Sequence, residues 1–396
     1  MITVLADDLS GALDTGVVFQ ERWDTVVVPD EEGYSNLIAG ENRPPVVVRN
    51  LADRHLSAHA SAALRQTAAL QAEAEETLYL KVDSTLRGPV GAQVEAVLTA
   101  VPRYRVALVC PAFPQNGRTV IDGHLYVEGQ RVERSALGRD PHNPITSGDL
   151  VEILAQTTAL PIHRLMHAPM GSQLGVWIYV ADARSDSDLA EIARYLGEHP
   201  DVLPVGSQGL AKALCRVWHQ GDATVRPRDV GAPAVDQIVA VVGTLHPTTR
   251  QQVATMKSRP GWEILDTIAG SRIPDQAHVI LTTPNDPIAN AEAAIEDLVG
   301  HAAQYIQTAR HRLLVVATGG DTVLALMRRL HVHHLTPRQE IAPGVVWSEG
   351  MMSEKTLFLV TKSGAFGGTE FFQTLVEWTR SRSGSVIPRR SHTCHP

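Results

Sequence analysis

The sequence predicts an α/β protein with two domains, each built on a mostly parallel sheet flanked by helices. Short apolar runs alternate with helical stretches along the chain, as they do in βαβ units. Polar or glycine-rich residues directly follow several of these runs, at the position where parallel strands expose their carboxyl ends. The chain has 396 residues, which is long for a single domain.

The composition excludes several classes of protein. Hydrophobic residues make up 44% of the chain and charged residues 20%, as in globular proteins, and the net charge of −8 does not indicate a nucleic-acid or membrane partner. The 3 cysteines are widely spaced, which favours reduced thiols over disulfides or a zinc site. Asp7 and Asp8 interrupt the first apolar run, so no signal peptide is predicted, and no run reaches the length of a membrane span. We therefore expect a cytoplasmic protein.

A change of composition marks the predicted domain boundary. The stretch from Gln220 to Pro233 carries charges, glycine and proline without an apolar period, as linkers do. We expect a first domain over residues 1–219, a linker over 220–235, a second domain over 236–385 and a disordered tail over 386–396.

The stretch from Lys81 to Gly88 is the most informative part of the first half. It follows a predicted buried strand and places two cations, a carboxylate and two hydroxyls within a few residues. At the carboxyl end of a strand, Lys81 and Arg87 could neutralise an anionic substrate while Asp83 and Ser84 bind its hydroxyl groups. The alternative is an ordinary loop whose charges pair with one another, and composition alone does not decide between the two.

Asp7 and Asp8 form a second candidate site after the predicted strand Ile2 to Ala6. Two adjacent carboxylates are costly unless a cation or a ligand hydroxyl pairs with them. One of them can be explained as the N-cap of the following helix, but not both. The chain then continues through a predicted parallel strand, Val26 to Val28, and a polar loop over residues 29–45.

Three glycine-containing turns follow predicted strands in the second half. Such turns, leading into helices, allow a phosphate to approach the backbone closely, and Asp321 could hold a metal or act as a base. The alternative for the Gly319-Gly320-Asp321 turn is a helix start capped by Asp or Thr. None is a Walker A loop or a GxGxxG fingerprint. The turns are Gly243–Thr249, Thr318–Thr322 and Thr361–Gly368.

Two histidine clusters could suggest metal binding, but the position of each has a simpler explanation. His331 to His334 lie where a helix is predicted to end, and His392 to His395 belong to the polar tail. We expect no metal at either cluster.

These motifs resemble those of the four-carbon acid sugar kinases, in the same order along nearly the whole chain. The resemblance implies an acid-sugar-binding domain, then a nucleotide-binding domain, with the active site in the cleft between them. It implies phosphorylation by ATP, with Mg²⁺, of the terminal 4-hydroxyl of an acid such as threonate, erythronate or 3-oxo-tetronate. The matching segments are Ala6-Asp7-Asp8, Gly11-Ala12, Asp14-Thr15-Gly16, Lys81–Gly88, Pro111–Pro114, Asn116–Thr119, Asp140-Pro141, Gly319–Thr322 and Thr361–Gly364.

The resemblance also assigns the site residues. It implies substrate contacts at Asp7, Asp8, Arg54, Lys81, Val82, Asp83, Ser84 and Arg87, and nucleotide contacts at Thr244, Gly319, Gly320, Asp321, Thr322, Gly364 and Gly367. Either Asp321 or Asp8 is the catalytic base, and the sequence does not choose between them.

Some questions stay open at this point. The segment from Arg49 to Arg54 departs from the family pattern where we expect it to face the substrate, which leaves the preferred acid and its stereoisomer undecided. The partners implied are a small sugar acid and ATP, and a homodimer is left open. The alternatives are a non-catalytic sugar-acid-binding or nucleotide-binding protein, a kinase of a related hydroxy acid such as 4-hydroxythreonine, and a dinucleotide-dependent α/β enzyme.

Overall fold

The structure is a computed structural model of the 396-residue chain. It describes residues 1–40, 42–72, 76–135, 138, 145–165, 175–218, 231–266, 273–274, 277–283 and 291–381. No helix in this described part has the length and apolar character needed to cross a bilayer.

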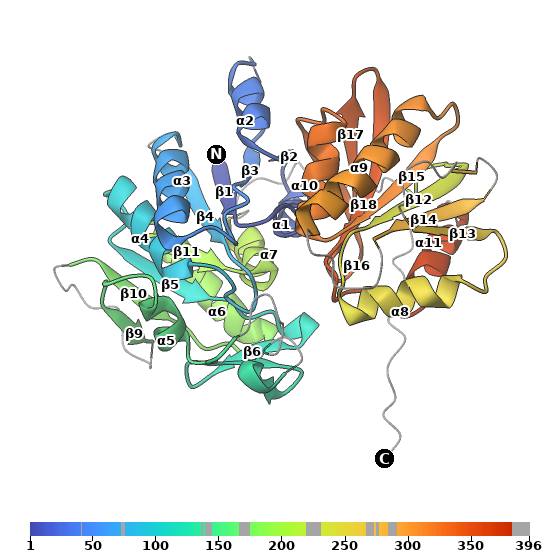
Figure 1. Ribbon diagram of the computed structural model, residues 1–396. Helices are drawn as coiled ribbons and strands as arrows, with labels where there is room; N and C mark the ends of the chain where they lie inside the picture. The colour runs from blue at the N-terminus through green and yellow to red at the C-terminus, as the bar shows by residue number, and fades with distance from the viewer. Residues whose placement is uncertain are drawn as a thin grey trace. The chain divides into compact units, whose positions relative to one another are not determined.

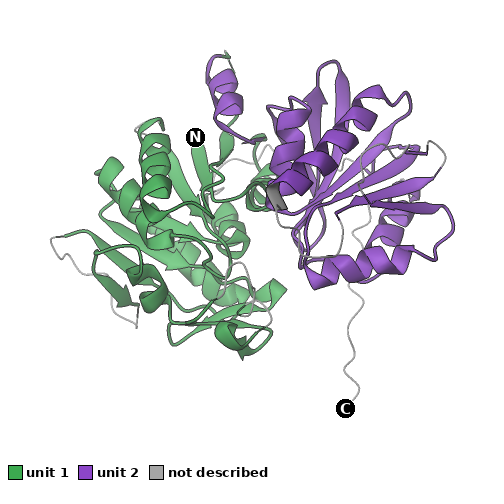
Figure 2. Ribbon diagram, viewed as in Figure 1, with its two compact units in different colours: residues 1–26, 40–226 green, residues 27–39, 227–396 purple. Residues whose placement is uncertain are grey.

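The chain divides into two compact units, coloured separately in Figure 2. The first contains residues 1–26 and 40–226, and the second contains residues 27–39 and 227–396. The sequence pattern gave no sign that a short N-terminal segment belongs with the C-terminal half.

The first unit is built on a parallel sheet, whose described strands follow the order β3-β1-β4-β11-β5-β10-β9. From β1 the chain continues to β3 on one side and then to β4 on the other. Such a switch point is where open α/β sheets bind ligands, outside the carboxyl ends of the strands. The strands are β1 (Ile2–Ala6), β3 (Val46–Asn50), β4 (Thr77–Lys81), β5 (Val106–Cys110), β9 (Ile162–Arg164), β10 (Trp177–Val180) and β11 (Val202–Gly206).

Helices cover both faces of this sheet. Helices α3 and α4 pack against each other on one face, and α1, α6 and α7 form a second group on the opposite face (Figure 1). This division follows from right-handed crossovers that run in opposite directions along the sheet. The helices are α1 (Leu9–Gln20), α3 (Ala58–Leu70), α4 (Val90–Ala100), α5 (Leu150–Ala155), α6 (Asp186–Glu198) and α7 (Gln208–Trp218).

A small antiparallel sheet accompanies the first unit. A tight turn at Glu128 and Gly129 joins β7 to β8, and both residues have positive φ (50° and 76°), as such a turn between twisted strands requires. Its elements are the 3₁₀ turns η1 (Pro114–Asn116) and η2 (Val132–Arg134) and the strands β6 (Arg118–Ile121), β7 (His124–Val127) and β8 (Gln130–Arg131).

The second unit has a mixed sheet, whose described strands follow the order β13-β14-β12-β15-β18-β17-β16. The strands from β13 to β18 run parallel, and β17 and β16 continue the sheet antiparallel. The strands are β12 (Gln237–Val242), β13 (Trp262–Asp266), β14 (His278–Thr282), β15 (Leu313–Thr318), β16 (Leu335–Ala342), β17 (Val345–Met352) and β18 (Lys355–Lys362).

The helices of this unit lie in two pairs (Figure 1): α9 packs against α10, and α8 packs against α11. The main core lies between the sheet and the second pair, where Trp347, Phe372 and Trp378 are nearly fully buried. The helices are α8 (Pro247–Met256), α9 (Ala291–Thr308), α10 (Gly320–Arg329) and α11 (Phe371–Arg380). The predicted α/β class, with a mostly parallel sheet flanked by helices in each half, is therefore confirmed.

Residues 29–45 were predicted as a polar loop, and this prediction is wrong. They contain α2 (Glu31–Ile38), in which Asp30 caps the first turn by accepting a hydrogen bond from the Gly33 amide (3.0 Å). Only Gly33, Tyr34 and Leu37 of this helix are buried, so it has too few apolar residues for its period to be recognised from sequence.

The preceding strand, β2 (Thr25–Val28), pairs antiparallel with β16 through Val27 and Leu335, although a parallel strand was expected. Helix α2 also lies close to the end of α10, because a Cβ on Gly33 would be 2.4 Å from the His333 carbonyl oxygen. The His334 ring lies 3.0 Å from the Gly33 carbonyl oxygen. These contacts explain why residues 27–39 belong to the second unit.

Candidate active site

In the first unit, three neighbouring strands end together at the carboxyl edge of the sheet. Ala6 of β1 pairs with Asn50 of β3 and with Lys81 of β4. The residues that follow these three positions therefore meet, and they include most of the substrate contacts that the family resemblance implied.

Arg54 joins the two N-terminal carboxylates. Its Nε and Nη2 donate to Asp7 (2.8 and 3.0 Å), and its Nη1 and Nη2 donate to Asp8 (2.9 and 2.8 Å). Asp8 also caps α1 by accepting a hydrogen bond from the Gly11 amide (2.8 Å). Burial raises the pKa of Asp7, but Arg54 and Lys81 outweigh it and hold that pKa below its usual value. Asp8 is therefore the N-cap of α1, and both carboxylates pair with a cation.

Lys81 is buried beside the same carboxylates. A Cβ on Gly11 would lie 2.5 Å from both Lys81 Nζ and Asp8 Oδ1, so glycine is the residue that leaves room for the ammonium group here. Burial lowers the pKa of Lys81, but Asp14, Asp7 and Asp8 raise it above its usual value. The lysine is therefore charged within the cluster.

Asp83 is held by the other end of the same loop. Arg87 donates to both of its carboxylate oxygens (2.8 and 2.7 Å), and the Thr85 amide and hydroxyl donate to Oδ2. Arg54 Nη2 lies 3.9 Å from Asp83 Oδ1, which connects the two ion pairs. Burial raises the pKa of Asp83, but Arg87 and Arg54 lower it well below its usual value.

The segment from Arg49 to Arg54, which departs from the family pattern, contains residues with two different roles. Arg49 is buried and donates to the Ala68 carbonyl (3.2 Å) and to Gln71 Oε1 (2.6 Å), near the end of α3. Asp53 is fully buried in a bidentate ion pair with Arg65 of α3. Of Arg49, Asp53 and Arg54, only Arg54 enters the charged cluster. The expectation that the whole segment faces the substrate is therefore wrong.

The remaining predicted residues of the loop differ in exposure. Val82 is fully buried, whereas Ser84 is half-buried. Sequence reasoning omitted Arg118 of β6 from the site, yet it interacts electrostatically with Asp83 and Arg87. Its signal was the Asn116–Thr119 motif, which followed another strand of the same sheet.

In the second unit, three parallel strands again end in one row. Val242 of β12 pairs with Thr318 of β15, and Thr318 pairs with Lys362 of β18. Each is followed at once by one of the predicted glycine-containing turns.

The three turns approach one another closely. A Cβ on Gly243 would lie 2.2 Å from Thr322 Oγ1, and a Cβ on Gly364 would lie 2.8 Å from Thr244 Oγ1. Gly319 has a φ of 92° at the start of α10, a conformation that favours glycine. The three glycine-containing turns therefore lie against one another at one edge of the sheet, and turns of this kind suit the binding of phosphate groups.

The turn after β18 is anchored from beneath by α8. Thr249 Oγ1 donates to the Gly364 carbonyl oxygen (2.7 Å). Gln252 Nε2 lies within 3.1 Å of the carbonyl oxygens of Phe366, Gly367 and Gly368. Both side chains are fully buried, and neither was identified from the sequence.

The same edge offers one carboxylate to a metal ion. Asp321 is exposed in the first turn of α10, where no side chain caps the helix start. The described residues contain no group of three or more His, Cys, Asp or Glu side chains able to hold a metal. This donor set fits Mg²⁺ bound mainly by nucleotide phosphates, because that ion commonly uses one or two protein carboxylates in kinases.

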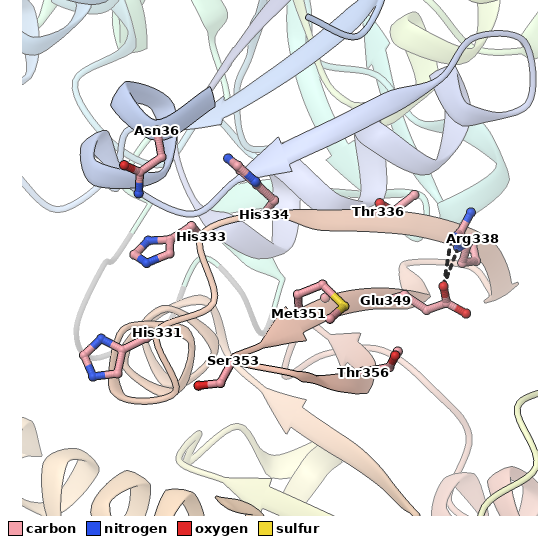
Figure 3. Close-up of a pocket in the computed structure, with 11 residues that line it drawn as sticks. Asn36, His331, His333, His334, Thr336, Arg338, Glu349, Met351, Ser353 and Thr356 are labelled. Carbon is pink, nitrogen blue, oxygen red and sulfur yellow. Dashed lines mark hydrogen bonds and ion pairs between the residues drawn. The ribbon is translucent and has the colours of Figure 1, made fainter. Parts of the chain in front are cut away.

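A cavity of about 590 Å³ lies in the second unit beside α2 (Figure 3). Its lining includes His331, His333, His334 and an Arg338–Glu349 ion pair (2.7 Å). None of its described lining residues is a predicted site residue. The second histidine cluster, His392 to His395, lies outside the described residues, as do Asp140 and Pro141.

Comparisons with known proteins match the two halves of the chain separately. Residues 2–214 match the model of a sugar-binding N-terminal domain, and residues 239–372 match that of a nucleotide-binding C-terminal domain. A D-threonate kinase of Bordetella bronchiseptica is 29% identical, over 96% of this chain and 98% of its own. A 3-oxo-tetronate kinase of Pseudomonas fluorescens is also 29% identical, over 94% of this chain and 95% of its own.

Solved structures agree on the fold. A Salmonella typhimurium protein has a TM-score of 0.76 at 21% identity, over 94% of this chain and 98% of its own. A Haemophilus influenzae protein has a TM-score of 0.69 at 20% identity, over 96% of this chain and all of its own. Fold, site and domain matches together define a protein with one sugar-binding and one nucleotide-binding domain. The chain belongs to the four-carbon acid sugar kinase family, whose members are phosphotransferases acting on a hydroxyl group.

Proposed function

We propose that this protein transfers the terminal phosphoryl group of ATP to the 4-hydroxyl of a four-carbon sugar acid. The observation that carries the proposal is the presence of two complementary sites in one chain. A balanced cluster of cations and carboxylates lies at the switch point of the first sheet, and three glycine-containing turns converge at the corresponding edge of the second. The first suits a small acid with hydroxyl groups, and the second suits phosphates.

The sugar acid meets a site whose charges are already paired. Of the five N–H donors of an arginine, Arg54 uses four on Asp7 and Asp8, whereas Arg87 uses two on Asp83. The Arg87 side chain is also 25% exposed, against 10% for Arg54. Arg87 is therefore the better carboxylate-binding group, and Arg54 holds Asp7 and Asp8 in place.

The carboxylates of the same cluster would bind the hydroxyl groups. Asp83 and Asp7 are held ionised by their arginine partners, so each accepts hydrogen bonds from a substrate hydroxyl. Ser84 is half-buried and adds a hydroxyl that donates or accepts. Lys81 supplies a positive charge that offsets the carboxylates Asp7, Asp8 and Asp14.

The nucleotide phosphates would lie against the backbone amides of the three turns. The turn residues that the resemblance assigned to the nucleotide, apart from Asp321, are Thr244, Gly319, Gly320, Thr322, Gly364 and Gly367. When bound, Mg²⁺ would be held mainly by the phosphates and would offset their charge, which leaves the Asp321 carboxylate available as a base. Phosphoryl transfer demands little beyond such positioning and charge stabilisation.

The geometry favours Asp321 over Asp8 as the catalytic base. Both oxygens of Asp8 accept hydrogen bonds from Arg54, and one also accepts the Gly11 amide. Asp8 is thus already occupied as the partner of Arg54 and as the cap of α1. Asp321 is exposed at a helix start beside the phosphate-binding turns. Asp321→Asn would abolish turnover while leaving sugar-acid binding intact.

The test is release of ADP from Mg-ATP by the purified protein. The acids are D- and L-threonate, D- and L-erythronate, 3-oxo-tetronate and 4-hydroxythreonine. Turnover with one of them, lost in Asp321→Asn, supports the proposal and assigns the substrate. Binding of acid and nucleotide without ADP release would instead identify a binding protein, and absence of nucleotide binding would overturn the kinase proposal.

A further inference from the structure

We propose that Lys362 is a positioning residue of the nucleotide site, and that its amine takes up a proton when nucleotide phosphates bind at the three glycine-containing turns. This inference rests on the proposed function, because it takes the turns as the phosphate site. Lys362 is the last residue of β18 and lies at the start of the third turn, directly before Ser363 and Gly364.

The position of the amine carries the argument. Lys362 is 1% exposed, and its Nζ donates to Thr249 Oγ1 (2.7 Å) and to the Ser363 carbonyl oxygen (3.3 Å). Thr249 in turn donates to the Gly364 carbonyl oxygen (2.7 Å). The amine is thus linked through one hydroxyl to the backbone of the turn, and the Phe371 ring lies on its other side (5.4 Å to the ring centre).

The described groups around Lys362 include no carboxylate paired with it. Glu370, at the start of α11, pairs with Arg259 (2.6 Å), and Arg250 of α8 donates to Thr282 and Thr283. On the neighbouring strands, the residues paired with Lys362 are Thr318 and Val345, which have no charge.

Two further titratable groups belong to elements that meet at the turns. His246 precedes α8, and Asp321 lies in the first turn of α10. Neither contributes to the protonation of Lys362, since burial alone lowers the pKa of its amine to about 7.

A buried lysine without a counter-ion is costly, and a nearby anion removes that cost. Phosphate groups bound to the amides of the third turn would supply negative charge within a few ångströms of Nζ. They would therefore favour the ammonium form, and the amine would gain its proton from solvent.

The direction of the pH effect follows. Because the pKa of the buried amine is about 7, most molecules of the free protein carry a neutral amine at pH 8, so binding at that pH requires proton uptake. Nucleotide affinity is then highest at low pH and falls as the pH rises above about 7, by up to about tenfold per unit. A permanently charged side chain at this position would remove the dependence.

The experiment is calorimetric titration of the purified full chain with ADP at pH 8, in buffers of different ionisation enthalpy. At this pH the ADP phosphates and a histidine of ordinary pKa no longer titrate, so neither contributes protons. The wild-type protein is expected to take up about one proton per nucleotide bound. Lys362→Met is expected to take up none and to bind ADP more weakly, while Lys362→Arg binds without uptake and with little pH dependence.

Lys355→Met is the matched control, because Lys355 lies at the other end of β18 and is exposed. It is expected to behave as the wild type. Nucleotide binding without proton uptake, or equal uptake in Lys362→Met, would overturn this inference alone. Absence of ADP and ATP binding in the wild type would overturn the proposed function together with the inference.

Discussion

Arg54 and Arg87 hold their carboxylates in different ways, and this difference assigns them different roles. Arg54 connects Asp7 and Asp8 through four hydrogen bonds, whereas Arg87 contacts Asp83 along one edge of its guanidinium group. At the residue scale, Arg87 is thus available to a ligand, and Arg54 is required to keep two adjacent carboxylates together.

Replacing Arg87 with Gln is expected to raise the KM for the sugar acid about 10- to 100-fold. The reason is the loss of a charged hydrogen-bonding partner for the substrate carboxylate, which contributes about 1.5–3 kcal/mol. The KM for ATP is expected to stay unchanged. Steady-state kinetics with each substrate varied in turn would measure this split.

Arg131→Gln is the matched control in the same unit, because Arg131 is partly exposed and its ion pair with Glu133 is long (3.8 Å). It should leave both KM values unaltered. An unchanged KM for the acid in Arg87→Gln would show that another cation binds the carboxylate.

The sequence was sufficient to locate these residues but not to assign their partners. Asp7, Lys81 and Asp83 were recognisable because each follows a short apolar strand, which is a local pattern. The pairing of Asp53 with Arg65, and of Arg49 with Gln71, depends on how α3 packs against β3. Such long-range contacts leave no periodic signal, so the role of the Arg49–Arg54 segment was misjudged.

At the element scale, α8 acts as a brace for the turn after β18. Gln252 holds three consecutive carbonyl groups of this turn, and Thr249 holds a fourth. Glycine-rich backbone has little rigidity of its own, so its amides remain fixed for a phosphate only if something anchors their carbonyl neighbours.

Gln252→Leu is expected to raise the KM for ATP about tenfold or more, with little change in the KM for the acid. The substitution leaves three turn carbonyls without their donor and frees the turn, at a cost of about 1–3 kcal/mol in stability. Gln251→Leu alters the neighbouring, exposed position of the same helix and should behave as the wild type. An equal effect of the two variants would disprove a specific anchoring role.

Helix α2 is an element that the sequence did not predict. Its cap, Asp30, is an ordinary helix signal, but its apolar side consists mainly of Tyr34 and Leu37. What stabilises it is packing against the backbone of His333, at a glycine that admits no side chain.

At the scale of the whole molecule, the chain forms two units with separate hydrophobic cores and separate ligand chemistry. The chain leaves the first unit after residue 26, contributes residues 27–39 to the second unit and returns to the first unit at residue 40. The sequence predicted a single boundary near residues 220–235 and did not predict this exchange. The fold class of each unit was predictable from local strand–turn–helix patterns. The assignment of residues 27–39 was not, because it depends on contacts with residues about 300 positions away.

Because the two units have separate cores, we expect each ligand to raise the unfolding temperature of only one of them. In differential scanning calorimetry, Mg-ADP is expected to raise the midpoint of one transition and the sugar acid that of the other, since each ligand binds one folded unit. At about 100 times Kd a ligand adds roughly 2.7 kcal/mol, which corresponds to a rise of several degrees for a unit of this size.

The two site variants identify which transition belongs to which unit. Gln252→Leu should lower the midpoint of the nucleotide-sensitive transition, and Arg87→Gln should weaken only the shift caused by the acid. The stability of the second unit should also rise between about pH 7 and the usual range for lysine, because unfolded Lys362 retains a proton that the buried amine has lost. A single transition that both ligands raise equally would show instead that the two cores unfold as one cooperative structure.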